Sequence, residues 1–156
     1  MTQTPELEQA LRGAALRVTR PRLAVLGALR EHAHATTDEV LRLVRRQHPE
    51  VSHQAVYDVL RVLTGTGLVR RIEPQGSVAR YEVRVGDNHH HLVCRSCGAI
   101  ADVDCSVGAA PCLTPSDNRG FVVDEAEVIY WGLCRACHAA PTVLPTLDSP
   151  AERGTR

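Results

Sequence analysis

The stretch VSHQAVYDVLRVLTGTGLVRRIE (51–73) decides the fold of the N-terminal half of this 156-residue chain. Ser52 is suited to cap a helix, and apolar residues from Val56 to Leu63 recur on one face of it. The glycines of TGTG (64–67) predict the end of that helix, and the β-branched run that follows predicts a strand. The pattern therefore predicts an amphipathic helix that leads directly into a β-hairpin.

Three further helices are predicted upstream of this stretch. Apolar residues at helical spacing indicate one near the N-terminus and one after Pro21, and Thr36 with Glu39 fits a capping box that opens the third. Downstream, the run VARYEVRV (78–85) supplies the second strand of the hairpin. Short helices followed by a hairpin describe a winged helix-turn-helix, in which the last helix enters the major groove. The alternative is a small helical domain whose hairpin binds protein or nothing.

A change of pattern at Gly86-Asp87-Asn88 predicts a domain boundary. Beyond it, the runs HLVC, AIADVD, FVVDEAE (121–127) and VIYWGLC indicate β structure, interrupted by a small-residue loop over 106–120 that can contain a short helix. The proline-rich tail from Pro141 is typical of disorder. We expect domains at 1–86 and 87–140 and a disordered tail at 141–156.

Four cysteines form two matched pairs, VCRSCG (93–98) and LCRACH (133–138). A C-x-x-C turn brings two thiolates to one ion, and two such turns supply the four sulfurs of a closed zinc site. The pairs therefore predict structural zinc at Cys94, Cys97, Cys134 and Cys137. A disulfide or a thioredoxin-like redox pair is the alternative. The histidine triplet 89–91 suggests a second metal, because imidazole binds zinc, iron, manganese and nickel.

Composition narrows the class of protein. The net charge is zero, but residues 1–86 contain 13 Arg against nine acidic residues, whereas residues 87–156 contain five Arg against nine. The first part can therefore meet phosphate. No apolar run approaches a membrane span, and the N-terminus lacks the pattern of a secretory signal, so we expect a cytoplasmic protein. A zinc hydrolase or deaminase would need H-E-x-x-H, or H-x-E with P-C-x-x-C, and neither motif occurs. We therefore expect no enzyme, although a thiol oxidoreductase or a zinc-binding adaptor remains an alternative.

The chain resembles the ferric uptake regulator family of metal-dependent bacterial repressors from about Leu11 to Cys137. Several long motifs carry the resemblance in the right order: RVTRPRLAVL (17–26), VSHQAVYDVLRVLTGTGLVRR (51–71), RYE (80–82), HHHLVCRSCGAIADVD (89–104) and IYWGLC (129–134). Within the family it is most similar to the actinobacterial redox-responsive branch that represses catalase genes. SVARYE, VGDNHHHLVCRSCG and DEAEVIYWGLC carry that narrower match.

The resemblance implies an α+β chain, with an N-terminal winged helix-turn-helix and a small C-terminal α/β dimerisation domain. That domain holds the two C-x-x-C turns, which we call the zinc knuckles. It also implies a homodimer on double-stranded operator DNA, with neither a membrane nor an organic cofactor as partner. The implied ligands of the regulatory metal are His34, Glu82, His89, His91 and Asp102. Strand alternation agrees, because His89 and His91 point one way and His90 the other. Three nitrogens and two carboxylates suit Fe(II) or Mn(II).

One residue of this set departs from the peroxide-sensing members of the family, which have Asp where this chain has Glu82. Iron sensors have Glu at that position. A further metal site of many members is poorly kept, because Asn88, His90 and Ala126 stand where its ligands are expected. We do not predict that site.

Residues of the predicted recognition helix and of the arginine-rich segments are the expected DNA contacts. Tyr57 and Arg61 face outward one turn apart, and the resemblance supports Tyr57 as a contact to a thymine methyl or a neighbouring base. Any single arginine can instead be a solvated surface charge. The full expected set is Ser52, His53, Gln54, Tyr57 and Arg61 for bases or phosphates, and Arg17, Arg20, Arg22, Arg70, Arg71 and Arg80 for phosphates.

Two cysteines remain outside the knuckles. Cys105 and Cys112 flank the segment SVGAAP and are either buried small hydrophobic residues or a reversible thiol pair. Taken together, we expect a repressor that needs iron or manganese, is relieved by peroxide or oxidation, and controls a catalase or catalase-peroxidase gene and its own promoter. The alternative is a regulator of iron, zinc or nickel uptake without peroxide sensing.

Overall fold

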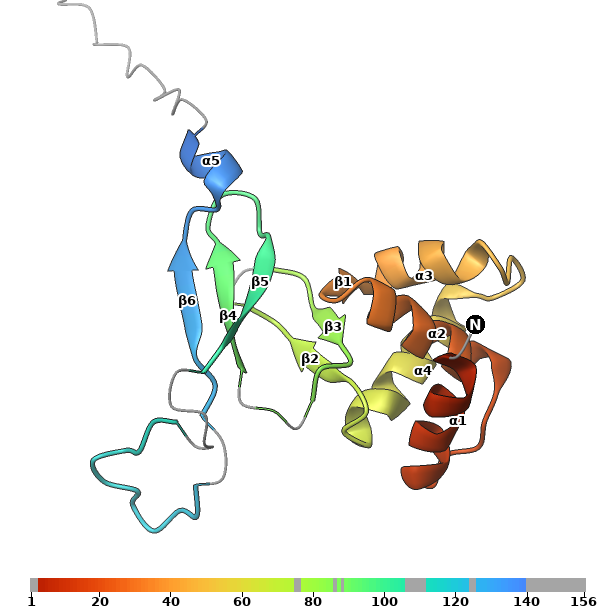
Figure 1. The fold of residues 1–156 in the computed structure, drawn as a ribbon, viewed down its shortest axis with the longest axis horizontal. Coiled ribbons are helices and arrows are strands. Elements are labelled where there is room, and N and C mark those ends of the chain that lie inside the picture. The colour runs from red at the N-terminus through yellow and green to blue at the C-terminus, as the bar shows by residue number, and fades with distance from the viewer. Residues whose placement is uncertain are drawn as a thin grey trace, which may run out of the picture.

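The computed structural model describes residues 3–74, 77–85, 87, 89–105, 112–123 and 126–139. Figure 1 shows a group of helices on one side and a separate twisted sheet on the other, with a smaller sheet between them. We call the helices and the smaller sheet the helical half, and the separate sheet the second sheet. In chain order the elements are α1 (Gln3–Gly13), α2 (Arg20–Glu31), β1 (Ala35–Thr36), α3 (Thr37–Arg45), α4 (His53–Gly65), β2 (Arg70–Ile72), β3 (Arg80–Glu82), β4 (His89–Cys94), β5 (Ile100–Asp104), β6 (Ile129–Gly132) and α5 (Arg135–Ala139).

The apolar faces of the four N-terminal helices make the main core. Leu11 of α1, Leu29 of α2, Val40 of α3 and Leu60 of α4 are all fully buried in it. The predicted capping box opens α3, because the Thr36 hydroxyl accepts from the Glu39 N–H while the Glu39 carboxylate accepts from the Thr36 N–H. The predicted winged helix-turn-helix is confirmed.

The smaller sheet has the order β1-β3-β2, and both pairs are antiparallel. Strands β2 and β3 form the predicted hairpin, which is the wing of the winged helix-turn-helix. Strand β1 was not predicted: its two residues, Ala35 and Thr36, pair with Tyr81 and Arg80 of β3. This pairing ties the loop before α3 to the wing, which places His34 beside the end of β3.

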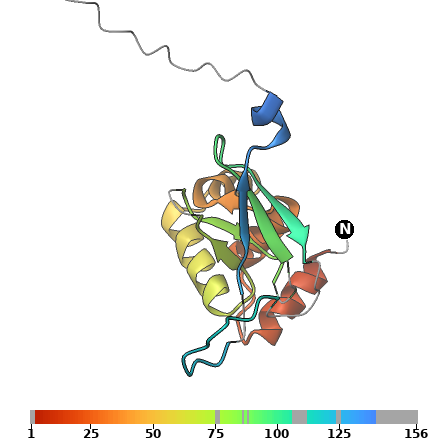
Figure 2. The same cartoon turned by 90° about the vertical axis from the view of Figure 1, so that its left-hand side faces the viewer.

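The second sheet has the order β5-β4-β6, with β5 antiparallel and β6 parallel to β4. Figure 2 shows this sheet in front of the helical half, with α5 at its far end. Strand β4 is almost wholly buried, whereas β6 is mostly exposed. The central strand is therefore the one that can position buried side chains.

One strand prediction is wrong. The run 121–127 is not a strand in its described residues, 121–123 and 126–127. Both edges of β4 are taken by β5 and β6, and Phe121 and Val122 lie exposed. The segment 112–120 contains no helix either. The tail 141–156 and most of the expected domain boundary lie outside the described residues, so the domain division stays a prediction. Within the described residues, no helix is long and apolar enough to cross a membrane.

Candidate metal centre

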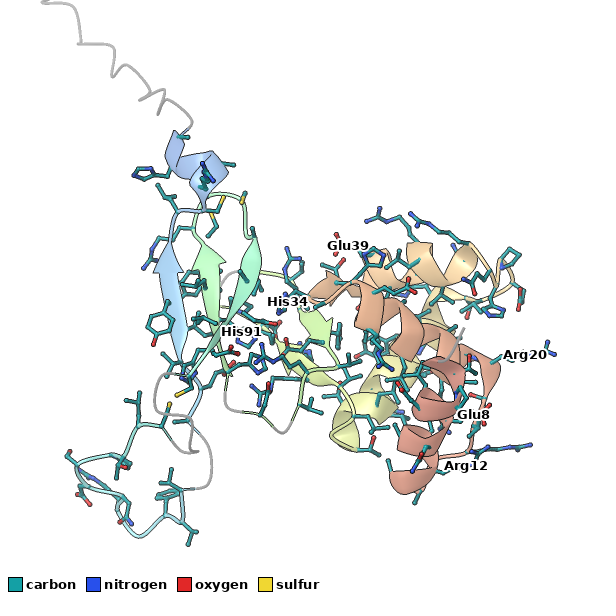
Figure 3. All side chains as sticks on the ribbon, in the orientation of Figure 1. Glu8, Arg12, Arg20, His34, Glu39 and His91 are labelled. Carbon is teal, nitrogen blue, oxygen red and sulfur yellow. The ribbon has the colours of Figure 1, made fainter. Side chains whose placement is uncertain are left out.

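Five side chains from four segments converge where the two sheets meet. His34 precedes β1, Glu82 ends β3, His89 and His91 lie on β4, and Asp102 lies on β5 opposite His91. Figure 3 shows His34 and His91 at the junction between the helical half and the second sheet. These are the five residues that the resemblance implied, and the fold brings all of them together.

The donor atoms of the centre lie at short range from one another. His34 Nε2 is 3.0 Å from Glu82 Oε2 and 2.8 Å from Asp102 Oδ1. His91 Nε2 is 3.5 Å from Glu82 Oε1 and 3.6 Å from Asp102 Oδ1. His89 Nε2 is 3.1 Å from Glu82 Oε1 but 4.0 Å from Asp102 Oδ1. His34, Glu82, His91 and Asp102 form the tightest group, and His89 joins it through Glu82.

The centre is buried and its hydrogen bonds are incomplete. Glu82 and His91 are fully buried, yet neither ring nitrogen of His91 has a hydrogen-bond partner. Asp102 Oδ1 also lacks one, although His34 Nε2 lies 2.8 Å away. Unpaired polar atoms in a buried site are costly. A cation placed among them would take the lone pairs of one His91 nitrogen and of Asp102 Oδ1.

The carboxylate of Glu82 is held in its charged form. Burial opposes ionisation, but the contacts from His34, His91 and His89 outweigh it and lower the pKa of Glu82 to about 2. Burial likewise opposes protonation of His34, and the neighbouring Glu82 and Asp102 carboxylates nevertheless raise the pKa of His34. Both shifts show that the carboxylates favour positive charge beside them, and a divalent cation could supply that charge in place of the proton on His34.

The distances also fit a metal. Two ligands at right angles and about 2.1 Å from one ion are about 3.0 Å apart, and tetrahedral ligands are about 3.4 Å apart. The observed separations of 2.8–3.6 Å between His34 or His91 and the carboxylates cover this range. Imidazole nitrogens mixed with carboxylate oxygens are typical of Fe(II), Mn(II) and Zn(II) sites.

Two residues that support the ligands were missed in the sequence. Asp87 Oδ1 lies 2.7 Å from His89 Nδ1 and so fixes which nitrogen of His89 faces the centre. Arg84 bonds to Asp87 and Asp104 and lies 3.8 Å from the outer oxygen of Asp102. An acidic residue two positions before His89 was the only available signal.

Arg80 has a role that the sequence did not suggest. Its guanidinium donates to the His34 carbonyl at 3.0 Å and lies 4.0 Å from Glu39. It also lies next to Gly98 of the first knuckle. His34 adopts a left-handed backbone conformation, with φ of +61°. Arg80 therefore holds a ligand loop in an uncommon geometry and lies close to both halves of the molecule.

The four knuckle cysteines also meet. Their sulfurs all lie within 4.8 Å of one another, and Cys97 Sγ is 3.8 Å from Cys134 Sγ. Sulfurs bound at about 2.3 Å to a tetrahedral zinc ion are about 3.8 Å apart, so the group fits that ion. Backbone N–H groups of Cys134 and Cys97 lower the pKa of the Cys94 thiol to about 6, which favours the thiolate that binds metal.

The expected DNA contacts lie mainly on α4 and the arginine-bearing segments. Tyr57 is half exposed and Arg61 is exposed on α4, while the Ser52 hydroxyl caps that helix by accepting from the Ala55 N–H. Figure 3 shows Arg20 extending away from the metal centre. Several others already have protein partners: His53 with Asp38, Gln54 with Asp58, Arg22 with the Arg17 carbonyl, and Arg71 with Glu73. Their DNA roles stay predictions.

The sequence matches the model of the ferric uptake regulator family over residues 13–128. The chain belongs to the ferric uptake regulator family. It is 64% identical to "Transcriptional regulator FurA" of Mycobacterium tuberculosis over 142 residues, which cover 91% of this chain and 97% of that one. It is 73% identical to "Ferric uptake regulation protein 1" of Mycolicibacterium fortuitum over 121 residues, 78% and 75% of the two chains.

Solved structures of ferric uptake regulators have the same fold. That of Vibrio cholerae superposes with a TM-score of 0.62 at 26% identity and covers 81% of this chain and 98% of its own. That of Helicobacter pylori superposes with a TM-score of 0.66 at 18% identity and covers 88% and 93%. The Mycobacterium tuberculosis relative is named a transcriptional regulator, the Helicobacter pylori structure is described as having three functional metal binding sites, and the Vibrio cholerae structure as having DNA-binding domains. The predicted family is confirmed.

Proposed function

We propose that the chain is a repressor of operator DNA that binds DNA when Fe(II) or Mn(II) occupies the centre at His34, Glu82, His89, His91 and Asp102. One observation carries the proposal: the ligands come from both sides of the link at 83–88, two from the helical half and three from the second sheet. A cation held by both halves fixes the angle between them.

That angle determines whether two copies can read one operator. In a homodimer built through the second sheets, each α4 helix has to reach its own half-site, and the spacing follows from the angle between the halves. Metal binding and DNA binding then favour the same arrangement, so each raises the affinity for the other by the same factor. His34 and Glu82 are the ligands that transmit the metal's presence to the helical half.

Exposed apolar residues on and near the second sheet support a homodimer. Phe121 and Val122 are exposed apolar residues, as are Tyr130 and Leu133 on and beside β6. A single chain gains nothing from leaving such residues in water, whereas a homodimer would bury them. The cysteine knuckles would hold zinc and join the end of β4 to the start of α5. That link would fix the relative positions of the elements that carry this surface.

We further propose that peroxide or another oxidant relieves repression, and that the targets are a catalase or catalase-peroxidase gene and the chain's own promoter. Iron(II), when bound, supplies the reactivity toward peroxide. His34 and His91 are the two histidines of the tightest donor group and are the ligands we expect to be oxidised. Loss of either one would remove a nitrogen from the centre.

A second function, iron-uptake regulation without peroxide sensing, is favoured by Glu82. Its carboxylate lies within 3.5 Å of donor nitrogens of His34, His89 and His91. A residue shorter by one methylene at that position would reach fewer of them. The named relatives are compatible with this function too, and metal-specific activation separates it from zinc or nickel sensing.

Fluorescence anisotropy of a labelled promoter fragment tests both functions. Zinc-containing protein is titrated with Mn(II) or Fe(II), each before and after stoichiometric peroxide. We expect both metals to switch binding on and peroxide to release only the iron form. If peroxide releases neither form, the iron-uptake function holds instead. Release of both forms would indicate that thiols such as Cys105 and Cys112 react with peroxide instead of the iron ligands. DNA binding that does not depend on metal would refute the proposal.

The matched variants are Glu82→Ala and Glu73→Ala. Glu82→Ala removes the central carboxylate and should abolish activation by either metal. Glu73→Ala removes an exposed carboxylate from the wing, about half of whose side chain is solvated, and should leave metal activation intact. Equal loss in both variants would mean that metal acts through general charge on the wing and not through the centre.

A further inference from the structure

Strand β4 presents histidines on both of its faces. His89 and His91 face the regulatory centre, and their partners in register are Asp104 and Asp102 of β5. His90 lies between them and points to the opposite face, because side chains alternate along a strand. It is 4% exposed, and its Nδ1 atom has no hydrogen-bond partner. A buried imidazole on this second face has no part in the proposed regulatory centre.

Two thiols meet His90 on that face. His90 pairs with Val103, so Cys105, two residues beyond Val103, continues the same face of β5. Cys112 returns to the sheet after the segment 106–111 and places its sulfur 3.3 Å from His90 Nε2. The donor atoms of His90, Cys105 and Cys112 all lie within 4.8 Å of one another. Both thiols are partly buried, and neither is in a disulfide.

We propose that His90, Cys105 and Cys112 bind a zinc ion, separate from the knuckle zinc and from the regulatory cation. The ligands are His90 Nε2 and the two Sγ atoms, with an exogenous ligand as the fourth. A nitrogen at about 2.05 Å and a sulfur at about 2.3 Å from one tetrahedral zinc are about 3.6 Å apart. The His90–Cys112 separation needs only a small adjustment to reach that value.

The ligand chemistry separates this site from the regulatory centre. Two thiolates and one imidazole are soft to borderline ligands and select zinc, whereas the regulatory centre mixes nitrogens with hard carboxylate oxygens. The two sites lie on opposite faces of β4, so this strand supplies ligands to a different metal ion on each face. The ion would also tie Cys112 to the end of β5, which fixes one end of the segment that leads toward β6.

Metal binding to full-length protein tests the proposal without DNA. Reduced protein, kept without oxygen, is first given zinc and then dialysed against a weak chelator, and its zinc content is measured. We expect Cys112→Ser to retain about one zinc ion fewer per chain than the wild type. The matched control His32→Ala removes an exposed histidine and should retain the full content.

Cobalt(II) identifies the ligands by absorption. After one equivalent of zinc has filled the knuckle site, added Co(II) should give a thiolate charge-transfer band that Cys112→Ser and His90→Ala weaken or abolish. The variant Cys112→His keeps a ligand at this position. It should retain metal with a weaker band, and this rescue separates ligand loss from misfolding.

Three results would overturn the proposal. The first is equal zinc content in wild type and Cys112→Ser. The second is a cobalt spectrum that Cys112→Ser and Cys112→His leave unchanged. The third is a Cys105–Cys112 disulfide that forms in full yield in the presence of excess zinc, because bound thiolates would resist it. That last result would assign the pair to thiol redox chemistry instead.

Discussion

Replacing Cys97 by serine should unfold the second sheet while leaving the helical half folded. Cys97 and Cys134 are 37 positions apart, and their sulfurs are 3.8 Å apart. The chain-entropy treatment of a cross-link of that span gives about 4 kcal/mol of stabilisation for the bridge that zinc makes. From residue 87 onward, Val93 and Cys94 are the only described apolar residues that are buried. So small a core cannot offset the loss.

The chain contains a probe for each half. Its single tryptophan, Trp131, lies on β6 with the Arg95 guanidinium 5.2 Å from the ring centroid, so its emission reports the second sheet. Far-ultraviolet circular dichroism reports mainly α1–α4, whose core contains no residue beyond 83. Urea unfolding is followed with both probes at one fixed protein concentration, because dimers gain stability from mass action.

We expect the Trp131 transition of Cys97→Ser to vanish or to move close to zero urea, with zinc content reduced. The dichroism transition should keep most of its amplitude and its midpoint. The matched control His138→Ala changes an exposed side chain next to the second knuckle and should leave both transitions in place. If the two probes shift by the same amount in Cys97→Ser, the halves unfold as one unit and the reasoning is refuted.

Three further changes test the regulatory centre, the wing and the cap of α3. Arg80→Ala should weaken Mn(II) binding by about 10- to 100-fold in a chelator competition, because it frees the His34 loop; an unchanged affinity would contradict this role. Arg71→Ala, the exposed matched control, should leave Mn(II) affinity intact and lower the salt slope of DNA binding by about 1; an unchanged slope would remove Arg71 from the phosphate contacts. Thr36→Ala should cost about 1 kcal/mol in urea unfolding, because it breaks the cap. The Thr36 backbone N–H lowers the pKa of Glu39, so the Glu39 contribution is complete above its ordinary pKa near 4.5 and is lost as the pH falls through the lower folded value. The difference in unfolding free energy between the wild type and Glu39→Gln should therefore shrink over this acid range, and a difference that stays constant would contradict the assignment.

The sequence predicted the elements that depend on local signals. The capping box at Thr36 and Glu39 and the amphipathic stripe of α4 are both patterns within a few residues, and both are present. The five ligands of the regulatory centre were implied by resemblance, since no local pattern relates His34 to Glu82 across 48 positions.

Long-range packing explains what could not be predicted. The strand expected at 121–127 has β-forming residues, but its described residues pair with neither outer strand of the second sheet. Arg80 looked like a phosphate anchor, because only the fold places it against the His34 carbonyl. The group of His90, Cys105 and Cys112 was missed because a loop separates the two thiols, and only strand register brings Cys105 to the face of His90.

The parallel pairing of β4 with β6 affects the order in which the chain can fold during synthesis. The core of the helical half is complete once Tyr81 has left the ribosome, because every buried residue in it lies at or before that position. Strand β4 has to wait for residues 129–132, and the four-cysteine group has to wait for Cys137. His34 and Glu82 are therefore in place before their partners on the second sheet can join them. A nascent chain therefore completes its helical half first and its five-residue metal centre last.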